Sequence, residues 1–566
     1  ALNAQNFTTS TDSNNTAVGY FAGLSVTTGI ANTLIGTQAG DAITDADYNV
    51  AVGNSALSTN QLGSKSIAIG HSALFTQNPT TATDMFNVGI GHAAGISVTT
   101  GTFNTLIGGL AGDALTTGSS NVAVGLSALS SDDVGRKSVA VGTSTLAAQN
   151  FTTATDSHNT AVGHEAGNSV TTGDQNTLIG SLAGDALTTG TRNIAIGVGA
   201  LSADTLGGRA TAVGTGALAS QNFTTTATDS HNTAVGFEAG NAVSTGIYNT
   251  LIGALAGDAL TDADNNVAVG RAALSSDQKG DGTIAIGRNA FVSQAFTGVT
   301  TTYNTAVGDK AGQANQSGRF NTYIGAEAGE TSSTSSNNTL LGYAAGKAIT
   351  TGDGNSTCIG TSAGANLTTG SGNTLIGASA GNLTVLLTEG DNNTLLGTGV
   401  RTSSATVDSE IVLGYNITGA GTNTVRIGTS TGGTATLNLD GSDTSWAAAS
   451  DQRLKKDIAN STVGLEFIKD LRPVTFKWNA KNAVANNLPQ YDAESSDPVY
   501  GKGKAHHGFL AQEVKATIDA HPDVANGHNI WIEDPDGTQQ IAPSALIPML
   551  VKAIQELEAR IATLEG

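Results

Sequence analysis

A short segment of the form Asn-x-x-x-Gly returns every 17 residues through most of the chain. The first three copies are Asn15-Thr-Ala-Val-Gly19, Asn32-Thr-Leu-Ile-Gly36 and Asn49-Val-Ala-Val-Gly53. There are 24 copies, the last ending at Gly428, and 17 of them begin with asparagine. After every fourth copy up to Gly287 the step lengthens to 21 or 22 residues, which adds a longer period of about 72 residues. Such a repeat restricts the chain to a stack of similar units that bury their apolar side chains against one another.

The repeat predicts a mainly β fold, a long β-solenoid or β-roll with one short strand in each 17-residue turn. Each copy has a β-branched run that ends at glycine, followed by small residues and a Thr-Thr-Gly or Asp-Ala-Asp turn. Alternation along the run predicts that Val18 and Ile35 face inward. The recurrent asparagines predict an internal ladder of stacked amides, and the recurrent glycines predict tight corners with positive φ. At ~4.8 Å per turn, 24 turns form a rod of roughly 115 Å.

Composition excludes several functional classes. The only cysteine is Cys358, so a disulfide framework within the chain and a cysteine-based zinc site are excluded. The net charge of −21 disfavours binding to nucleic acid or to anionic lipid, and there is no apolar run of the ~18 residues that a membrane span needs. The turns at Asp45–Asp47 and Asp262–Asp264 lack the glycine-rich nonapeptide of calcium-binding rolls, so we interpret them as solvated turns. We expect no cofactor and no metal.

The longer steps insert about four residues at regular heights of the stack, and these residues must bulge outward. Phe151 and Phe223 lie in two of these insertions. One hypothesis makes the two rings platforms for a glycan, and the alternative is a packed bulge that closes a corner. The Asn-x-Val-x-Ile-Gly core of the repeat resembles the head of trimeric autotransporter adhesins, and the repeats also resemble those of phage tail fibres. Adhesin-head repeats are usually shorter.

The composition changes at about residue 450. Residues 450–566 hold 28 charged residues and seven of the eight prolines, whereas the first 449 residues hold 43 charged residues. Three sequence clusters follow the change: Trp446-Ala-Ala-Ala-Ser450-Asp451-Gln-Arg453-Leu454-Lys455-Lys456-Asp457-Ile458, Gly464-Leu-Glu-Phe-Ile-Lys-Asp-Leu-Arg-Pro473-Val-Thr-Phe-Lys-Trp478-Asn, and His507-Gly508-Phe509-Leu-Ala511-Gln512-Glu513-Val514. This ordered set resembles the self-cleaving intramolecular chaperone domain of phage endosialidases and tail fibres, which also occurs in the eukaryotic myelin regulatory factor.

The resemblance implies a peptidase mechanism at named positions. Ser450 matches the nucleophile and attacks the carbonyl of Ala449, Lys455 matches the general base of a Ser-Lys dyad, and Asp451 matches an acidic residue that orients the scissile turn. A lysine serves as a base only where burial lowers its pKa. A serine and an aspartate before basic residues are also typical of a helix N-cap, which is the alternative interpretation of these residues.

Several nearby residues carry groups that are suited to the same chemistry. Lys456 is the alternative base, one position further along the chain. We interpret His506 and His507 as structural residues, because the resemblance demands no histidine base. Gln512 and Glu513 fit a core motif of the family and are expected to pack or cap rather than react.

The C-terminus carries an apolar seam with steps of 4, 3, 4 and 3 residues, at Leu550, Ile554, Leu557, Ile561 and Leu564. This heptad spacing predicts a coiled-coil helix, and isoleucine and leucine at both seam positions are compatible with three strands. The resemblance implies a homotrimer. Holding three C-termini together sets a common register before the repetitive turns pair between chains.

We therefore expect four regions: a β-roll shaft over 1–430, a connector over 431–449, a chaperone and autoprotease domain over 450–545, and a trimerising helix over 546–566. The chain begins inside a repeat and without methionine, so we expect a truncated N-terminus and a missing region for attachment to a virion. The first hypothesis is a phage tail fibre of the extracellular virion tail that binds a host cell-surface glycan or protein receptor. The alternatives are a bacterial or prophage-encoded adhesin on the cell surface and, less favoured, a polysaccharide depolymerase, for which the shaft lacks a paired acid and base.

Overall fold

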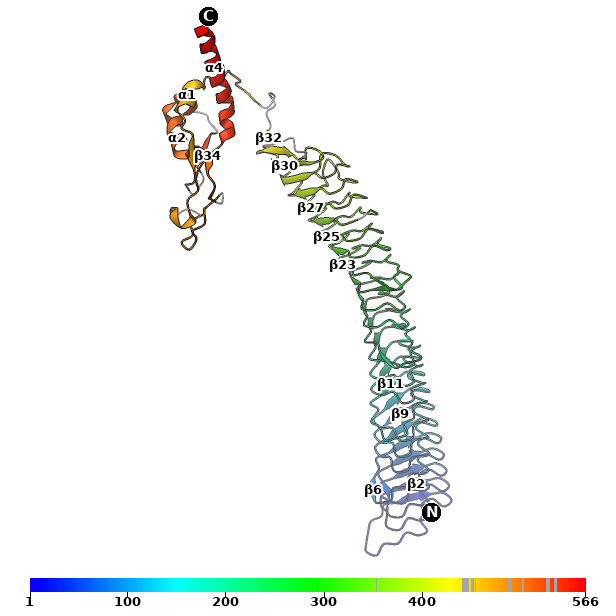
Figure 1. Cartoon of the computed structure of the whole chain (residues 1–566). Helices are drawn as coiled ribbons and strands as arrows, with labels where there is room; N and C mark the ends of the chain where they lie inside the picture. Colours follow the sequence, from blue (N-terminus) through cyan, green and yellow to red (C-terminus); the bar gives the residue numbers. More distant parts are fainter. Residues whose placement is uncertain are drawn as a thin grey trace. The chain divides into compact units, whose positions relative to one another are not determined.

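The structure is a computed structural model that describes residues 1–352, 354–439, 447–448, 452, 455–486, 490–500, 503–525, 530–533 and 537–565. The chain divides into two compact units, Ala1–Ala449 and Ser450–Gly566. The first unit is a column of stacked turns, each with a short strand on the same side (Figure 1). The second is a small unit with helices and short strands.

The 24 repeats each contribute one strand to a single sheet. Twenty-two of these strands are three residues long, and the last two are longer. In chain order they are β1 (Thr16–Val18), β2 (Thr33–Ile35), β3 (Val50–Val52), β5 (Ile67–Ile69), β7 (Val88–Ile90), β8 (Thr105–Ile107), β9 (Val122–Val124), β10 (Val139–Val141), β11 (Thr160–Val162), β12 (Thr177–Ile179), β13 (Ile194–Ile196), β15 (Thr211–Val213), β17 (Thr233–Val235), β18 (Thr250–Ile252), β19 (Val267–Val269), β21 (Ile284–Ile286), β23 (Thr305–Val307), β24 (Thr322–Ile324), β25 (Thr339–Leu341), β26 (Thr357–Ile359), β27 (Thr374–Ile376), β28 (Thr394–Leu396), β29 (Ile411–Tyr415) and β30 (Thr424–Thr429). The predicted mainly β solenoid is confirmed.

Every strand pairs in parallel with the strand of the next turn, and equivalent residues of the repeat lie opposite each other. Leu34 pairs with Ala51, for example, and Ile35 pairs with Val52. Because the turns stack in register, each position of the repeat forms its own column along the shaft.

The expectation that Val18 and Ile35 face inward is wrong. The middle residue of each strand is the buried one, as at Leu34 and Ala51, whereas Val18 is 59% exposed and Ile35 is 38% exposed. The asparagine before the strand sets the phase, because its side chain is buried in most turns. With a period of two, the residue two positions further on also faces inward, and its two neighbours face outward.

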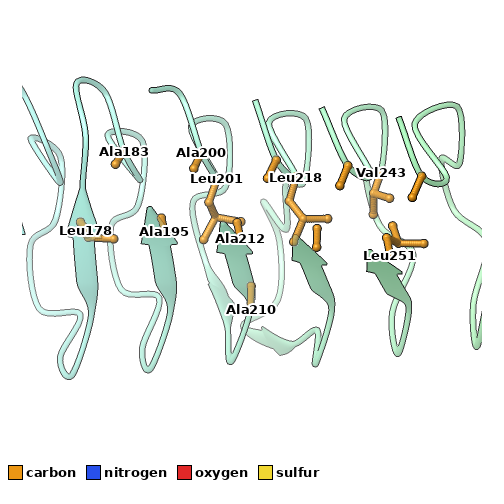
Figure 2. Packing of buried hydrophobic residues seen from close by; sticks show 14 of the residues in the cluster. Leu178, Ala183, Ala195, Ala200, Leu201, Ala210, Ala212, Leu218, Val243 and Leu251 are labelled. Carbon is orange, nitrogen blue, oxygen red and sulfur yellow. The ribbon is translucent and has the colours of Figure 1, made fainter. Parts of the chain in front are cut away.

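The large side chains of the interior follow the longer period of about 72 residues. Up to Leu375, where the strand carries leucine, the position six residues later is glycine, as at Leu34 and Gly40. A Cβ at Gly40 would lie 2.8 Å from the Leu34 side chain. In the two turns before each longer step the strand carries alanine, as at Ala195 and Ala212, and the position six residues later carries a buried leucine or phenylalanine, such as Leu201 or Leu218 (Figure 2). No turn up to the last longer step carries a large side chain at both positions, as a closely packed interior requires.

The buried asparagines form a ladder, although their bonds differ from those we expected. Most of the ladder bonds join an amide side chain to the backbone of the next turn rather than to another amide. The Oδ1 of Asn32 accepts from the N–H of Asn49 at 3.0 Å, and the Nδ2 of Asn32 donates to the carbonyl of Ala46 at 2.9 Å. The side chain thereby satisfies buried backbone groups that the short strands leave unpaired.

The longer steps do bulge outward, as predicted. Three of them add a two-stranded parallel sheet beside the main one: β4 (Gly63–Ser64) with β6 (Thr83–Asp84), β14 (Gly207–Gly208) with β16 (Thr228–Asp229), and β20 (Gly280–Asp281) with β22 (Thr300–Thr301). The tips of the insertions are exposed, for example at Thr80 and Thr81. The aromatic rings are not at these tips, because Phe151 is only 5% exposed and Phe223 only 8%.

A buried carboxylate lies beneath three of the four insertions. Asp132 Oδ2 accepts from Gln149 Nε2 at 2.7 Å, and its Oδ1 accepts from the N–H of Gly135 at 3.0 Å. Asp204 and Asp277 have equivalent bonds to their own glutamines. Burial raises the pKa of all three carboxyls, and the hydrogen bonds offset part of that rise. The first insertion has Asn60 at the equivalent position, bonded to Gly63.

Replacing Asp132 with asparagine is therefore expected to stabilise the shaft at pH 7, on the order of 1 kcal/mol. Because the folded-state pKa of Asp132 is raised, its contribution to stability is present below the ordinary carboxyl pKa and is lost as the pH rises through the raised value. Thermal unfolding of both chains at pH 4 and pH 7 tests this, and the stability difference should shrink at pH 4. An Asp132→Asn chain that is less stable than wild type at pH 7 would contradict it.

The parallel stack ends in antiparallel strands. β31 (Gly433–Asn438) folds back on β30, and β32 (Ala447–Ala448) pairs with β31. In β30 the inward position belongs to Arg426, whose Nη1 donates to the carbonyls of Thr418 and Gly419 at 3.0 and 3.1 Å. The Arg426 guanidinium, hydrogen-bonded to these two carbonyls, ends the column of apolar side chains in the interior. The antiparallel strand β31 covers the edge of the last parallel strand, β30.

The second unit is a small α+β fold. Its helices are α1 (Leu465–Asp470), α2 (Ala511–Ala520), α3 (Pro522–Ala525) and α4 (Ile547–Glu565), with short 3-10 turns at Lys481–Ala483 and Pro543–Leu546. Two hairpins pair β33 (Val474–Phe476) with β34 (His506–Gly508) and β35 (Trp531–Glu533) with β36 (Gln539–Ile541). The buried core is small and includes Phe467, Val514 and Ile518. Among the described residues, no helix has the length and apolar composition that crossing a bilayer requires.

Candidate functional site

The predicted cleavage point lies between the two compact units. Ala449, Ser450 and Asp451 are outside the described residues. The residues just before them, Ala447 and Ala448, form β32 and pair with Thr436 and Ala435 of β31. The backbone that leads to Ala449 is therefore held in a ladder at the end of the solenoid.

The predicted base, Lys455, lies just beyond the cleavage point. Its backbone N–H donates to the carbonyl of Gln452 at 3.1 Å. Its side chain is exposed in the single chain, as is that of the alternative base Lys456, which lies 3.9 Å from the carboxylate of Asp457. A lysine acts as a general base where burial removes it from water, and both of these side chains are exposed to solvent in the single chain.

The fold brings together the second and third sequence clusters, which lie about 30 residues apart. Thr475 pairs with His507 and Phe476 with His506 in the β33–β34 hairpin. The Phe476 and His506 rings stack at 5.8 Å between centroids, and Phe476 meets Trp478 edge-on at 5.4 Å. Both histidines lie in a paired strand, where His506 joins the aromatic cluster and the side chain of His507 is exposed.

A cavity of about 710 Å³ opens where these two clusters meet. Its wall is formed mainly by aromatic, aliphatic and amide side chains, including Phe476, Trp478, Tyr500, Phe509 and Gln512. None of the described residues that line it is a carboxylate. The apolar side chains and the amides offer packing surface and hydrogen-bonding groups within one concave site.

Glu513 has a structural contact rather than a catalytic one. In the first turn of α2, it forms a paired salt bridge with Arg472, whose Nε donates to the carboxylate at 2.9 Å. Hydrogen bonding to the Arg472 guanidinium lowers the pKa of this carboxyl. The pair joins the segment after α1, in the middle of the second cluster, to the third cluster, and the sequence analysis did not single out Arg472.

The C-terminal seam faces away from its own unit. In α4, Leu550, Ile554, Leu557 and Ile561 are between 42% and 64% exposed, and Leu564 is 86% exposed. The opposite side of α4 contacts the unit, where Ala553 is buried and Glu556 accepts from the N–H of Leu465 at 2.8 Å. The predicted coiled-coil positions are thus presented outward by a helix that is fixed on its other side.

The shaft shows a different set of surface features from those we predicted. Because Phe151 and Phe223 are buried, the prediction that they are glycan platforms is wrong, and the alternative of a packed bulge is confirmed. Exposed stacked rings occur elsewhere, at Phe86 and Phe103 with centroids 5.5 Å apart. Among the described residues, no group of three histidine, cysteine or acidic side chains is arranged to hold a metal ion.

Comparison with known proteins identifies one part of the chain. Residues 450–521 match the model of the family described as Chaperone of endosialidase. No curated protein and no solved structure matches the chain. The match begins at Ser450, the first residue of the second compact unit. A chaperone-of-endosialidase domain thus follows a long β-solenoid.

Proposed function

We propose that this chain is an adhesive fibre protein whose C-terminal unit assembles three copies and then releases itself by cutting the bond between Ala449 and Ser450. The observation that carries the proposal is the coincidence of three features at one position. The family match begins at Ser450, the second compact unit begins there, and the solenoid ends in β32 just before it. A cut at this point separates two complete folding units.

The proposed chemistry uses the residues on either side of the bond. The Ser450 Oγ attacks the Ala449 carbonyl carbon and passes its proton to Lys455 Nζ. The C–N bond then breaks and the Ser450 nitrogen takes a proton, which leaves an ester between Ala449 and the Ser450 oxygen. Water hydrolyses this ester to the Ala449 carboxylate and restores the Ser450 hydroxyl. Asp451 orients the turn that presents the carbonyl.

Assembly is the proposed trigger for this reaction. Lys455 is exposed in the single chain, whereas a lysine that acts as a base is removed from water. Packing of three C-terminal units would remove Lys455 from water and allow it to accept the serine proton. Scission would then follow assembly, and a shaft that leaves its assembly unit behind persists because its unfolding is slow.

The shaft is the part that would act after scission. Its regular turns and exposed loop tips suit a stiff fibre that presents side chains to a host cell-surface glycan or protein. We favour a phage tail fibre, with a bacterial or prophage-encoded surface adhesin as the alternative. A polysaccharide depolymerase is less well supported, because the shaft repeats place their carboxylates in turns, whereas glycoside hydrolysis needs an acid and a base at a fixed separation.

A double substitution in the α4 seam tests the coupling of assembly to scission. Replacing Ile554 and Leu557 with aspartate leaves the cleavage residues intact but places six charges at the seam of a trimer, so we expect an uncut monomer. Glu558→Gln, at an exposed position outside the seam, is the control and should form a cut trimer. Light scattering of the purified chains reports the assembly, and a denaturing gel reports the scission. A seam variant that is cut while monomeric would contradict the proposal.

A further inference from the structure

Two columns of outward-facing side chains run the whole length of the shaft. In the 22 three-residue strands they are the first and third residues, and β29 and β30 continue them at Ile411, Leu413, Val425 and Ile427. The first column holds only threonine, valine and isoleucine, and the second only valine, isoleucine and leucine. None of these 48 positions carries a charge, although the chain has 71 charged residues and a net charge of −21. We call these two columns the strand face.

The strand face is open in the single chain. Ile69, Ile179, Ile252 and Ile324 are each between 37% and 39% exposed, even though the turns above and below cover part of each side chain. The in-register parallel pairing makes the exposure continuous from turn to turn. Over roughly 115 Å of shaft, with columns ~7 Å apart, the uncharged strip covers on the order of 1,000 Å². Of its 48 side chains, 34 are valine, isoleucine or leucine and 14 are threonine, which adds a methyl group and a hydroxyl. A monomeric protein rarely exposes an apolar patch of more than about 600 Å².

Charged pairs border the strand face on both sides. Two residues before the strands, Lys65, Lys137 and Arg209 form salt bridges with aspartates of the insertions. Two residues after β21, Arg288 pairs with Asp309 of the next turn. An apolar strip with a polar rim is the usual composition of a protein–protein interface.

We propose that the strand face is where the shafts of three copies of this chain pack on one another around a common axis; the proposal rests on the trimeric assembly proposed above. A partner must present an apolar strip of the same length, with side chains at the same spacing of ~4.8 Å per turn. A second copy of the chain meets both requirements. Three copies place their charge-free strips at the axis and keep their acidic side chains outside, where water separates them.

The same uniformity explains why the fibre needs an assembly unit. In 21 of the 24 turns both strand-face residues are threonine, valine or isoleucine, so sliding one shaft by a turn replaces β-branched side chains with others of similar size. The face thus stabilises association but specifies the register poorly. The apolar seam of α4 sets the register at one end.

Single cysteines in one turn test the proposal. Ile179 lies on the strand face. Thr189, ten residues further along the same repeat, is exposed and lies outside the strand face. Each is replaced by cysteine in the full chain, and the protein is treated with a short bis-maleimide. The native Cys358 is fully buried, and burial raises the pKa of its thiol to about 12, so it stays unreactive. Native mass without the reagent reports the assembly.

The expected result is that the shaft band of Ile179→Cys shifts from the mass of one chain to that of two chains, while Thr189→Cys remains at one. Trimers in which Ile179→Cys stays at the mass of one chain would overturn the strand-face proposal and leave the proposed function standing. Chains that are monomeric by native mass would overturn both. Cross-linking of both variants to the same extent would also overturn the assignment of this face.

Discussion

A chain with Ser450 replaced by alanine is expected to remain a single 566-residue polypeptide, while the wild-type chain separates into fragments of 449 and 117 residues. Without the Oγ there is no nucleophile for the Ala449 carbonyl, and an uncatalysed peptide bond is stable on any laboratory time scale. Assembly should be unaffected, because the seam of α4 and the strand face are unchanged. Intact mass after denaturation measures the outcome directly.

Neighbouring lysines provide the matched comparison for the same experiment. Lys455→Met should block scission as completely as the serine substitution, whereas Lys456→Met, one residue further along, should be cut like wild type. The opposite pattern would move the role of base to Lys456. Scission of the Ser450→Ala chain at the same bond would exclude the proposed nucleophile.

Replacing Gly108 with alanine is expected to have the largest effect on the shaft. The φ of Gly108 is +135°, a conformation that residues with a Cβ rarely adopt, and an added Cβ would overlap the carbonyl oxygen of Gly125 in the next turn. Backbone strain and this overlap together cost about 2–5 kcal/mol. The turns around β8 should separate locally, which hydrogen exchange and limited proteolysis detect.

Gly109 is the adjacent control. It has no positive φ, and a Cβ at that position meets only the Leu126 side chain, at 3.5 Å. The Gly109→Ala chain should therefore show the same protection of backbone amides from hydrogen exchange as the wild-type chain. Equal protection from hydrogen exchange in the Gly108→Ala and Gly109→Ala chains would contradict this expectation, because it would show that the position of Gly108 tolerates a side chain.

The architecture of the shaft could be predicted because its sequence contains 24 copies of one repeat. The strand positions, the parallel stacking and the corner glycines all follow from the repeat. The side-chain phase could not be read from the strand alone, since Thr33-Leu34-Ile35 is compatible with either face. The buried Asn32 decides it, and the burial of that amide becomes visible only in the bonds it makes to Asn49 and Ala46. This phase is what exposes the strand face.

The candidate site was predictable only as a motif. The order of the three clusters in residues 446–514 predicted the chaperone domain, and the family match over 450–521 supports it. Arg472 and Glu513 are 41 residues apart in the sequence and meet only in the tertiary fold, so no local sequence pattern indicates their contact. The environment of Lys455 depends on partner chains, which a single sequence does not describe.

Native mass spectrometry of the purified wild-type chain tests the central claim most directly, because it reports assembly and scission in one spectrum. The account predicts a trimer of residues 1–449, and residues 450–566 released from it with Ser450 as the first residue. Intact chains of 566 residues in a trimer would contradict the scission. Single copies of 1–449 that have been cut but never assembled would contradict the role of the C-terminal unit in holding three chains together first.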